Sequence, residues 1–375
     1  MNSACNNWLN SITWQADFYG RSWQQARRDP EFDWAWFERG GSGPLAPLKN
    51  LVRSGLKIAG LRQRGPLSVD WVHENVDVLW STRSMLSDDL SRLLFDAAIV
   101  VRIVDHRHFY FPRIDFDDLV DVKGTQPFED TKLPHDYLGV PLKIFEVSVR
   151  DRLDIPTLKM ITTEVQLQLL NSYRQYLIRR DRSDISPVAG DVVLDCGACI
   201  GEVSLLFAGL VGPSGAVHLF DPIPLHIRYC ALQAMQNPTL SSVMHLNALA
   251  ISDTTRITQS NSTDLEKINP GNFSLENFST TTIDDYATEH LERVDFIKMD
   301  IEGAELAALS GAANVIGRHR PKLAISGYHK PEDLWEIPNK IMDLNPNYVL
   351  SFGHHSPVPW ESVFYAEDPL KASSF

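Results

Sequence analysis

A glycine-rich turn behind a short apolar segment is the densest group of residues that could do chemistry. Asp195, Gly197 and Gly201 have the spacing D-x-G-x-x-x-G, after an apolar, β-branched segment at residues 192–194. Residues 202–210 then have the pattern of a helix. Glycine allows a tight turn and lets the backbone approach a ligand where a side chain would collide. This strand, turn and helix predict one half of a nucleoside-binding site.

An acidic residue ends the next predicted strand. Residues 216–220 are apolar, and Asp221 follows them, 20 residues after Gly201. A carboxylate at this place can accept hydrogen bonds from both hydroxyls of an adenosine ribose. The turn lacks the G-x-G-x-x-G spacing of a dinucleotide site, and its first residue, Asp195, is an acid that would repel a pyrophosphate. Such an acid suits the cationic amino-acid tail of S-adenosylmethionine, so the sequence favours a methyl donor over NAD.

A second set of acids follows another predicted strand, at residues 294–299. Asp300 and Glu302 lie where that strand ends, and open α/β sheets bind their ligands at the carboxyl ends of their strands. Glu305 begins the next helix, where an acid is favoured by the helix dipole alone. We therefore expect Asp300 and Glu302 to belong to the site and assign no chemistry to Glu305.

A histidine follows the next predicted strand, residues 322–326. His329 lies at the carboxyl end of that strand, beside the inferred donor site, which makes it a candidate for proton transfer as well as for a structural role. Pro331 then begins a helix that runs to about residue 344. Two final strands, residues 348–352 and 361–366, enclose a loop that could close over a substrate.

The elements that must position these residues alternate between short apolar strands and helices from about residue 191 onward. This alternation predicts a βαβ sheet. Upstream the pattern is mixed, with helices predicted at residues 88–98 and 161–177 and strands at residues 100–104 and 108–111. Five of the nine tryptophans lie in the first 36 residues, so we expect that segment to dock on the catalytic domain or on a second copy of the chain. A helix with a solvated basic face is predicted at residues 48–61.

The composition is that of an ordinary globular protein and excludes several classes. The chain has 375 residues, of which 43% are hydrophobic and 22% charged, which is enough for a large core. Its formal net charge of -13 disfavours a nucleic-acid partner. Four cysteines in so long a chain form no disulfide framework, and we find neither a signal peptide nor an apolar run long enough to cross a bilayer. We therefore expect a cytoplasmic location.

Five motifs together resemble the FkbM-type S-adenosylmethionine-dependent methyltransferases. They are VLDCGACIGE at residues 193–202, FDP at 220–222, IKMDIEGAE at 297–305, YHKPEDL at 328–334 and WESVFYA at 360–366. The resemblance covers about residues 188–366, and its most specific motif is D-x-E-G-A-E. It implies an α/β fold with a Rossmann-like seven-stranded methyltransferase sheet whose last strand is antiparallel. The implied activity is O-methylation of sugars, polyketides or some carboxylic acids.

The resemblance also implies which residues bind the donor. Two positions depart from the family's usual residues, because Cys199 stands where asparagine is usual and Asp221 where glutamate is usual. Asp221 keeps the carboxylate and shortens its reach. The donor site implied by the resemblance consists of Asp195, Gly197, Ala198, Gly201, Asp221, Pro222 and Asp300.

Methyl transfer from a sulfonium is an in-line displacement, so alignment of the reacting atoms supplies much of the catalysis. A hydroxyl acceptor must also lose its proton. One hypothesis is that His329 is the general base and that Asp300 and Glu302 orient the acceptor or tune the base. The alternative is that Asp300 and Glu302 hold Mg²⁺, which would lower the pKa of the acceptor. A carboxylate acceptor would be ionised already and would need no base.

We expect two units in the chain. Residues 1–155 are predicted to form a mainly helical region that acts as a substrate lid or joins two copies of the chain, and residues 156–375 the methyltransferase domain. The expected acceptor is a small molecule or a glycan. Two other functions remain open, an NAD-dependent oxidoreductase and a catalytically inactive methyltransferase-like module that binds partners through its aromatic N-terminus.

Overall fold

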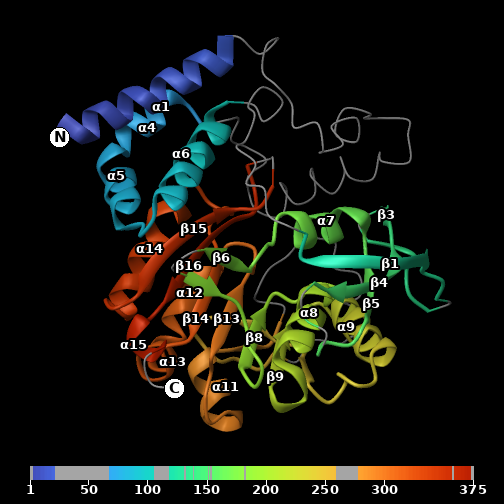
Figure 1. Cartoon of the computed structure of the whole chain (residues 1–375). Helices are drawn as coiled ribbons and strands as arrows, with labels where there is room; N and C mark the ends of the chain where they lie inside the picture. Colours follow the sequence, from blue (N-terminus) through green and yellow to red (C-terminus); the bar gives the residue numbers. More distant parts are fainter. Residues whose placement is uncertain are drawn as a thin grey trace.

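The computed structural model describes residues 3–21, 67–104, 118–130, 132–137, 139–150, 152, 154–180, 183–258, 278–356 and 359–372. Its centre is a seven-stranded sheet with the order β10-β9-β8-β13-β14-β16-β15 (Figure 1). The strands are β8 (Val192–Cys196), β9 (Ala216–Phe220), β10 (Met244–Asn247), β13 (Phe296–Met299), β14 (Lys322–Ser326), β15 (Val349–His354) and β16 (Ser362–Glu367). The first five are parallel, whereas β16 lies antiparallel between β14 and β15. The expected α/β fold with an antiparallel last strand is confirmed.

The central strands are apolar on both faces because both faces are covered. Val193 and Phe296 pack into one core, whereas their chain neighbours Leu194 and Ile297 pack into the core on the opposite face. Successive side chains of a strand point to opposite faces, so a sheet buried twice needs continuous apolar runs. This is why the strands could be predicted from short apolar segments without an alternating pattern.

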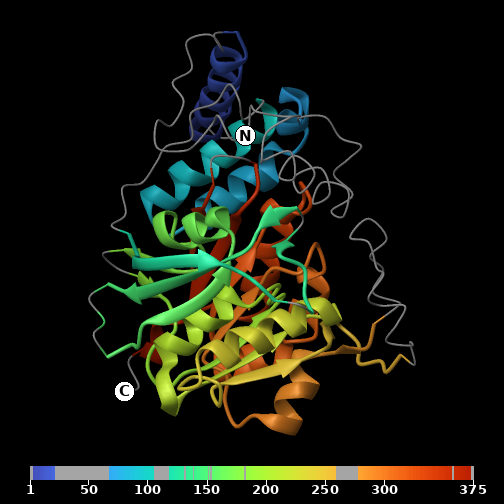
Figure 2. The same cartoon turned by 90° about the vertical axis from the view of Figure 1, so that its right-hand side faces the viewer.

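One face of the sheet is covered by two helices and a second sheet. The helices α8 (Glu202–Val211) and α9 (Pro224–Gln236) contact β5 (Leu158–Thr162). With β1 (Val120–Pro127) and β4 (Lys143–Val149), β5 forms a three-stranded antiparallel sheet that lies outside these helices (Figure 2). The following helix α7 (Glu164–Ser172) completes this side.

Helices pack on the opposite face. They are α11 (Ile283–His290), α12 (Glu305–Ser310), α13 (Ala313–His319) and α14 (Asp333–Leu344). An N-terminal helical layer of α1 (Ser3–Arg21), α4 (Val69–Glu74), α5 (Val76–Met85) and α6 (Asp89–Ile103) lies beside them, at the β15 edge of the sheet (Figure 1). Helix α6 contacts β15 and helix α5 contacts α14. The helical layer and the sheet therefore share one core.

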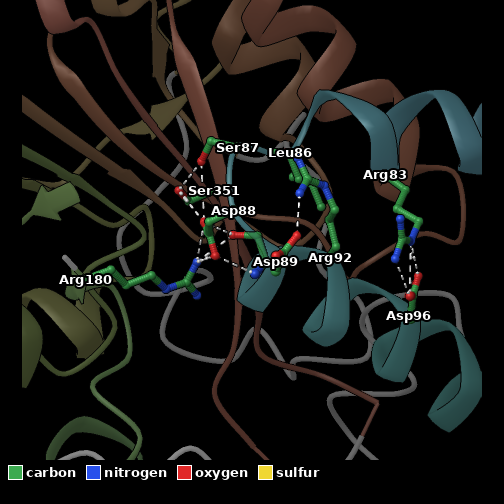
Figure 3. A network of polar contacts seen from close by, with 10 residues as sticks. Arg83, Leu86, Ser87, Asp88, Asp89, Arg92, Asp96, Arg180 and Ser351 are labelled. Carbon is green, nitrogen blue, oxygen red and sulfur yellow. Dashed lines mark hydrogen bonds and ion pairs between the residues drawn. The ribbon is translucent and has the colours of Figure 1, made fainter. Parts of the chain in front are cut away.

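A polar network ties the helical layer to the sheet (Figure 3). Asp88 caps α6 by accepting a hydrogen bond from the Ser91 amide at 2.8 Å. Arg180 lies 2.9 Å from Asp88 and donates to the carbonyl of Phe352 in β15 at 2.8 Å. Trp8 of α1 donates to Asp96 of α6 at 2.7 Å, so described residues of the N-terminal segment dock on this same chain.

The remaining described elements are short. They are β2 (Asp136–Tyr137), β3 (Val140–Pro141), β6 (Ile178–Arg180), β7 (Ser183–Ile185), β11 (Ala250–Ile251), β12 (Thr280–Thr281), η2 (Gly212–Ser214) and α15 (Pro369–Ala372). Within the described part of the chain, no helix combines the length and the apolar character that a bilayer crossing needs.

Two predicted elements are wrong. Residues 100–104 were predicted as a strand, but α6 continues through Ile103, because the β-branched run packs into the core along with Phe95. Residues 161–177 were predicted as one helix, but β5 ends at Thr162 and α7 begins only after Thr163, whose hydroxyl caps it by accepting from the Gln166 amide. The elements predicted at residues 48–61 and 108–111 lie outside the described residues.

The expected boundary between residues 155 and 156 separates two paired strands. It falls between β4 and β5, which pair antiparallel from Lys143 opposite Thr162 to Val147 opposite Leu158. The division into residues 1–155 and 156–375 stays a prediction, and any unit that begins at residue 156 takes one strand from this small sheet.

Candidate active site

The carboxyl ends of the parallel strands bring the predicted site residues to one edge of the sheet. The glycine turn follows β8, Asp221 follows β9, Asp300 follows β13, and His329 lies three residues beyond β14. Backbone hydrogen bonds connect these loops. The Asp300 amide donates to the carbonyl of the last residue of β8 at 3.0 Å, and the Ala198 amide donates to the carbonyl of the last residue of β9 at 3.0 Å.

The glycines of the turn are required by neighbouring protein atoms. Gly197 and Gly201 have φ angles of 83° and 87°, in the left-handed region that favours glycine. A Cβ atom at Gly197 would collide with the carbonyl oxygen of Asp300, and one at Gly201 would lie 2.9 Å from the sulfur of Cys230. These glycines were expected to allow the approach of a ligand. In the structure Gly197 lets the turn meet the Asp300 loop, and Gly201 lets it lie close to helix α9.

A buried ion pair lies beneath the turn. Asp195 is fully buried, with Oδ1 3.0 Å from Lys298 Nζ and Oδ2 accepting from the Ser204 hydroxyl at 2.5 Å. Burial alone would lower the pKa of Lys298, but the charge of Asp195 raises it, so the lysine is cationic. Lys298 also donates to the Gly197 carbonyl at 2.6 Å. This pair fixes the turn from below, and protein atoms enclose the Asp195 side chain.

Asp221, the residue expected to bind the ribose, belongs to a ring of four residues in contact with one another. Asp221 Oδ1 lies 3.0 Å from His226 Nδ1, and Asp221 Oδ2 accepts from the Cys199 amide at 3.0 Å. The Tyr137 hydroxyl lies 3.3 Å from His226 Nε2 and 3.0 Å from Cys199 Sγ. Tyr137 belongs to β2, so the β2–β3 hairpin reaches the turn that follows β8.

The charges in this region fit a ligand that brings hydroxyl or ammonium groups. Burial would lower the pKa of His226, but the charge of Asp221, 3.0 Å from its Nδ1 atom, raises it. Glu202, the first residue of α8, has an oxygen, Oε2, without a hydrogen-bond partner among the described residues. Burial raises the pKa of Glu202 to about 7. An unsatisfied buried acceptor of this kind can take a hydrogen bond from a ligand.

Asp300 is an ionised carboxylate held by two phenols. Tyr176 donates to Asp300 Oδ2 at 2.6 Å, and the Tyr328 hydroxyl lies 3.0 Å from Oδ1. Burial opposes ionisation of Asp300, but the hydrogen bond and charge of His329, together with the charge of Lys298, hold its pKa well below the usual range. The side chain keeps 20% of its surface exposed, so the carboxylate is open to a ligand on one side.

His329 lies between two carboxylates. Its Nε2 atom is 3.3 Å from Asp300 Oδ1, its Nδ1 atom is 3.1 Å from Glu305 Oε1, and its side chain is only 2% exposed. Burial would lower the pKa of His329, but the charges of Glu305 and Asp300, which lie close to its two ring nitrogens, raise it well above the ordinary value. The ring is therefore an imidazolium at neutral pH, with an acid within 3.3 Å of each nitrogen. Glu305, to which the sequence argument gave no chemistry, is buried and belongs to this cluster.

The donor atoms near Asp300 do not suit the expected Mg²⁺. One ligand atom each from Asp300, Glu305 and His329 lies within 4.8 Å of the others. A protonated imidazole offers no lone pair to a metal, and Mg²⁺ prefers oxygen ligands in an octahedron. Glu302 is 47% exposed and its Oε2 atom lies 3.8 Å from His329 Nε2. Asp300 and Glu302 thus converge on a cation of the protein itself, and we derive no step through a metal.

A further acid completes the edge. Glu361 immediately precedes β16, and its carboxyl accepts a hydrogen bond from Gln175 Nε2. Gln175 Nε2 also donates to the Tyr176 hydroxyl at 2.9 Å, which in turn donates to Asp300. Partial burial, together with the charge of Asp300, raises the pKa of Glu361 to about 8.

The two histidines of the terminal loop point into the protein. The Nδ1 atom of His354 lies 2.8 Å from the Ser362 hydroxyl. His355 donates from Nδ1 to the Tyr173 carbonyl at 2.6 Å, and its Nε2 lies 2.8 Å from the Tyr365 hydroxyl. Burial lowers the pKa of His355 to about 4, so it is neutral. The prediction that this loop closes over a substrate also involves residues 357 and 358, which lie outside the described part of the chain.

Sequence analysis missed several residues that the structure brings to this edge. Glu305 and Glu361 lie inside two of the quoted motifs, and this was an available signal. Tyr137 and Gln175 had no local signal, because they come from segments far from the motifs in the chain. The missed residues are Tyr137, Gln175, Tyr176, Glu202, His226, Lys298, Glu305, Tyr328 and Glu361.

The sheet order, the glycine turn and the acids at the strand ends are those of the Rossmann-like methyltransferase fold. The family model of the Methyltransferase FkbM domain matches residues 195–349. This stretch is therefore an FkbM-type methyltransferase domain, and the resemblance seen in the motifs is confirmed. No curated protein matches the chain.

One solved structure of the same family has a similar fold. A methyltransferase FkbM from Methylobacillus flagellatus KT is 20% identical, with a TM-score of 0.52, over 79% of this chain and 59% of that chain. The chain thus spans less than two thirds of that protein. Fibrillarin from Aeropyrum pernix with natively bound S-adenosyl-L-methionine is 12% identical, with a TM-score of 0.33, over 66% of this chain and 99% of that chain.

Proposed function

We propose that the protein is an S-adenosylmethionine-dependent O-methyltransferase that acts on a hydroxyl group of a small molecule, of the sugar, glycan or polyketide type. The proposal rests on one observation. The glycine turn, Asp221 and the loop that begins at Asp300 lie together at the carboxyl ends of the parallel strands of one sheet. Parallel α/β sheets bind their ligands at this edge. A carboxylate acceptor is the alternative within the same reaction class.

Two acids can bind the methyl donor. Asp221 would accept hydrogen bonds from the ribose hydroxyls, and the unsatisfied Glu202 would take a hydroxyl or the ammonium group. Asp195 and Lys298 act one layer below by fixing the turn. S-adenosylmethionine, when bound, supplies an electrophilic methyl group.

The residues around Asp300 can hold and orient the acceptor. Asp300 is ionised and partly exposed, so it can accept a hydrogen bond from a substrate hydroxyl, while Tyr176 and Tyr328 fix its direction. Such alignment contributes to an in-line displacement by holding the reacting atoms in line. His329 lies between Asp300 and Glu305. This position favours a cation that keeps Asp300 and its loop in place over a general base.

The test is calorimetric titration with S-adenosylhomocysteine. The wild type is expected to bind one equivalent. Asp221→Asn, which keeps the shape and removes the charge, is expected to weaken binding about 10- to 100-fold, the usual range for a hydrogen bond to a charged group. Asp343→Ala, an exposed acid of α14, is the control and should bind like the wild type.

Each other function has its own outcome in this titration. Binding of NAD without binding of S-adenosylhomocysteine would support the oxidoreductase. Tight donor binding without transfer of a labelled methyl group to any acceptor of a broad panel would support the inactive module. Association through residues 1–155, a cytoplasmic location and the absence of a nucleic-acid partner stay predictions.

A further inference from the structure

We propose that Glu361 accepts the proton of the acceptor hydroxyl and that the acceptor is an uncharged hydroxyl compound. This inference rests on the proposed function and adds the base and the charge class of the substrate. Glu361 lies inside one of the quoted motifs, and its place at the site follows from the way the last strand enters the sheet.

The antiparallel direction of β16 brings Glu361 to the site. Because β16 runs opposite to β14, its first residues lie beside the last residues of β14, where Ser326 pairs with Val363. The Gly327 amide donates to the Ser362 carbonyl at 2.8 Å, which fixes the loop that carries Tyr328 beside Glu361. An acid placed before an antiparallel last strand therefore lies at the carboxyl edge of the parallel strands.

Glu361 differs from the other acids of the site in how its carboxyl is used. Asp300 is bound by two phenols and lies against His329, and Glu305 is buried and accepts from the Ile301 amide at 2.8 Å. The carboxyl of Glu361 is partly exposed and accepts one hydrogen bond given by the described residues, from Gln175. It thus keeps lone pairs available for a proton.

The backbone holds Glu361 in an unfavourable conformation. Its φ angle is 68°, a value that costs a residue with a side chain free energy and that persists where the surrounding structure enforces it. Among the described residues other than glycine, φ is positive at six, and Tyr176 (65°), Cys199 (51°) and Glu302 (57°) of the same edge are among them. Strain of this kind concentrates where side chains are positioned for chemistry.

The charges that face Glu361 argue for an uncharged acceptor. The groups that act on it electrostatically are Asp300 and Glu302 from the loop after β13, Tyr328 and His329 from the loop after β14, and Tyr176 from the segment after α7. Asp300 is ionised, and burial raises the pKa of Glu302 to about 7. A carboxylate acceptor would add a further negative charge beside the ionised Asp300, so it would be repelled. Partial burial and Asp300 raise the pKa of Glu361 to about 8, close to where a general base is most effective.

The step balances without any further reactant. The hydroxyl oxygen forms a bond to the methyl carbon while the carbon–sulfur bond breaks and the sulfur keeps the electron pair. The hydroxyl proton passes to the carboxylate of Glu361 and from there to water. The products are a methyl ether, S-adenosylhomocysteine and a proton.

The test compares Glu361→Gln, Glu361→Asp and Glu367→Gln, the last an acid at the opposite end of the same strand. The probes are tritiated S-adenosylmethionine with methyl α-D-glucopyranoside and, as the charged counterpart, its uronate. We expect E361Q to lower kcat/KM for the neutral glycoside about 100-fold or more, E361D to restore part of it, and E367Q to change nothing. In the wild type kcat/KM should rise with pH up to about 8, and in E361Q this rise should be lost.

Two measurements keep the outcome decisive. S-adenosylhomocysteine titration of wild type and E361Q separates the two proposals, because equal binding means that the donor site stands whatever E361Q does to the rate. Carboxyl NMR of the protein labelled with [δ-¹³C]glutamate, saturated with S-adenosylhomocysteine, reports Glu361 directly by comparison with E361Q. A titration midpoint near 8 supports the proposal even if neither probe is methylated, whereas an ordinary glutamate midpoint, full activity of E361Q or preference for the uronate would overturn it.

Discussion

His329 illustrates how the surroundings of a residue change the role that its type suggests. A histidine at a strand end beside a donor site has the position of a general base. Here both ring nitrogens face carboxylates, and the raised pKa keeps the ring protonated, so it offers no lone pair. Its contribution is to neutralise Asp300 and Glu305, which would otherwise repel each other in a poorly solvated site.

His329→Gln is expected to lower the free energy of unfolding by about 3 kcal/mol, because it leaves two acids without their cation. The raised pKa of His329 contributes stability that is complete below its unfolded value of about 6.5 and is lost as the pH rises. The lowered pKa of Asp300 contributes above its unfolded value of about 3.9. Urea unfolding at a series of pH values should therefore show the largest deficit between about pH 4 and 6.5.

The control for this variant is His73→Gln, an exposed histidine of α4, which should unfold like the wild type at every pH. A deficit in H329Q that stays constant from pH 5 to 9 would contradict the protonated state. It would leave only a packing role for the ring.

Two glycines give a matched pair for backbone strain. Gly197→Ala is expected to destabilise by about 3 kcal/mol or more, because the added Cβ meets backbone atoms of Asp300 and φ is 83°. Gly317→Ala lies inside α13 with open space around the new atom, so it is expected to stabilise by about 0.5 to 1 kcal/mol. Thermal unfolding of both variants checks the pair. Equal melting temperatures would show that the two loops do not press on Gly197.

The sequence was sufficient for residues whose role follows from their place at a strand end, and insufficient for those defined by distant contacts. Asp221 and Asp300 could be placed because a strand of known direction precedes each. Glu305 was set aside because a helix start explains an acid by itself, and only the fold showed His329 within reach of it. Gln175 connects to Glu361 across 186 positions of the chain, which no local pattern encodes.

At the scale of elements, the β2–β3 hairpin is attached to the donor turn through a side chain. Tyr137 contacts both Cys199 and His226, and Cys199 has a positive φ of 51° where the family usually has asparagine. Asparagine tolerates the left-handed conformation better than cysteine does. The thiol contact with Tyr137 is therefore one interaction that helps to hold the turn in this conformation.

Tyr137→Phe is expected to weaken binding of S-adenosylhomocysteine about 3- to 10-fold, the value of one ordinary hydrogen bond, because the ring around Asp221 opens. Calorimetry measures the change. Tyr348→Phe removes a phenol that donates to the Pro321 carbonyl, away from the turn, and should leave the affinity unchanged. Equal weakening in both variants would indicate a general loss of stability and would argue against a role for the hairpin at the donor site.

Element type could be predicted best where a cap or a turn agreed with the apolar pattern. The strands at residues 216–220 and 322–326 match β9 and β14 in full. The β-branched run at the end of α6 predicts a strand because local preference favours one. Packing of that run among the helices and β15 decided otherwise, and this is a tertiary effect that a local pattern does not contain.

At the scale of the whole molecule, the N-terminal helices and the sheet are parts of one core. Residues of α1, α5 and α6 belong to the same buried apolar cluster as β14, β15 and α14. Phe95 of α6 meets Phe352 of β15 edge to face at a ring distance of 5.4 Å. The Arg180 network adds a polar attachment at the same interface (Figure 3). This interface couples the helical layer to β15, which pairs with β16, the strand that Glu361 precedes.

Phe95→Ala is therefore expected to destabilise the helical layer and the sheet together. The side chain is fully buried, and truncation of such a phenylalanine costs about 3 to 5 kcal/mol. Hydrogen exchange followed by mass spectrometry should show faster exchange in β15 and β16 as well as in α5 and α6, whereas Val78→Ala, on the exposed face of α5, should change neither. If exchange accelerates in the helices alone, the layer opens as a separate unit, and its use as a lid over the acceptor becomes the better explanation for its place at this edge.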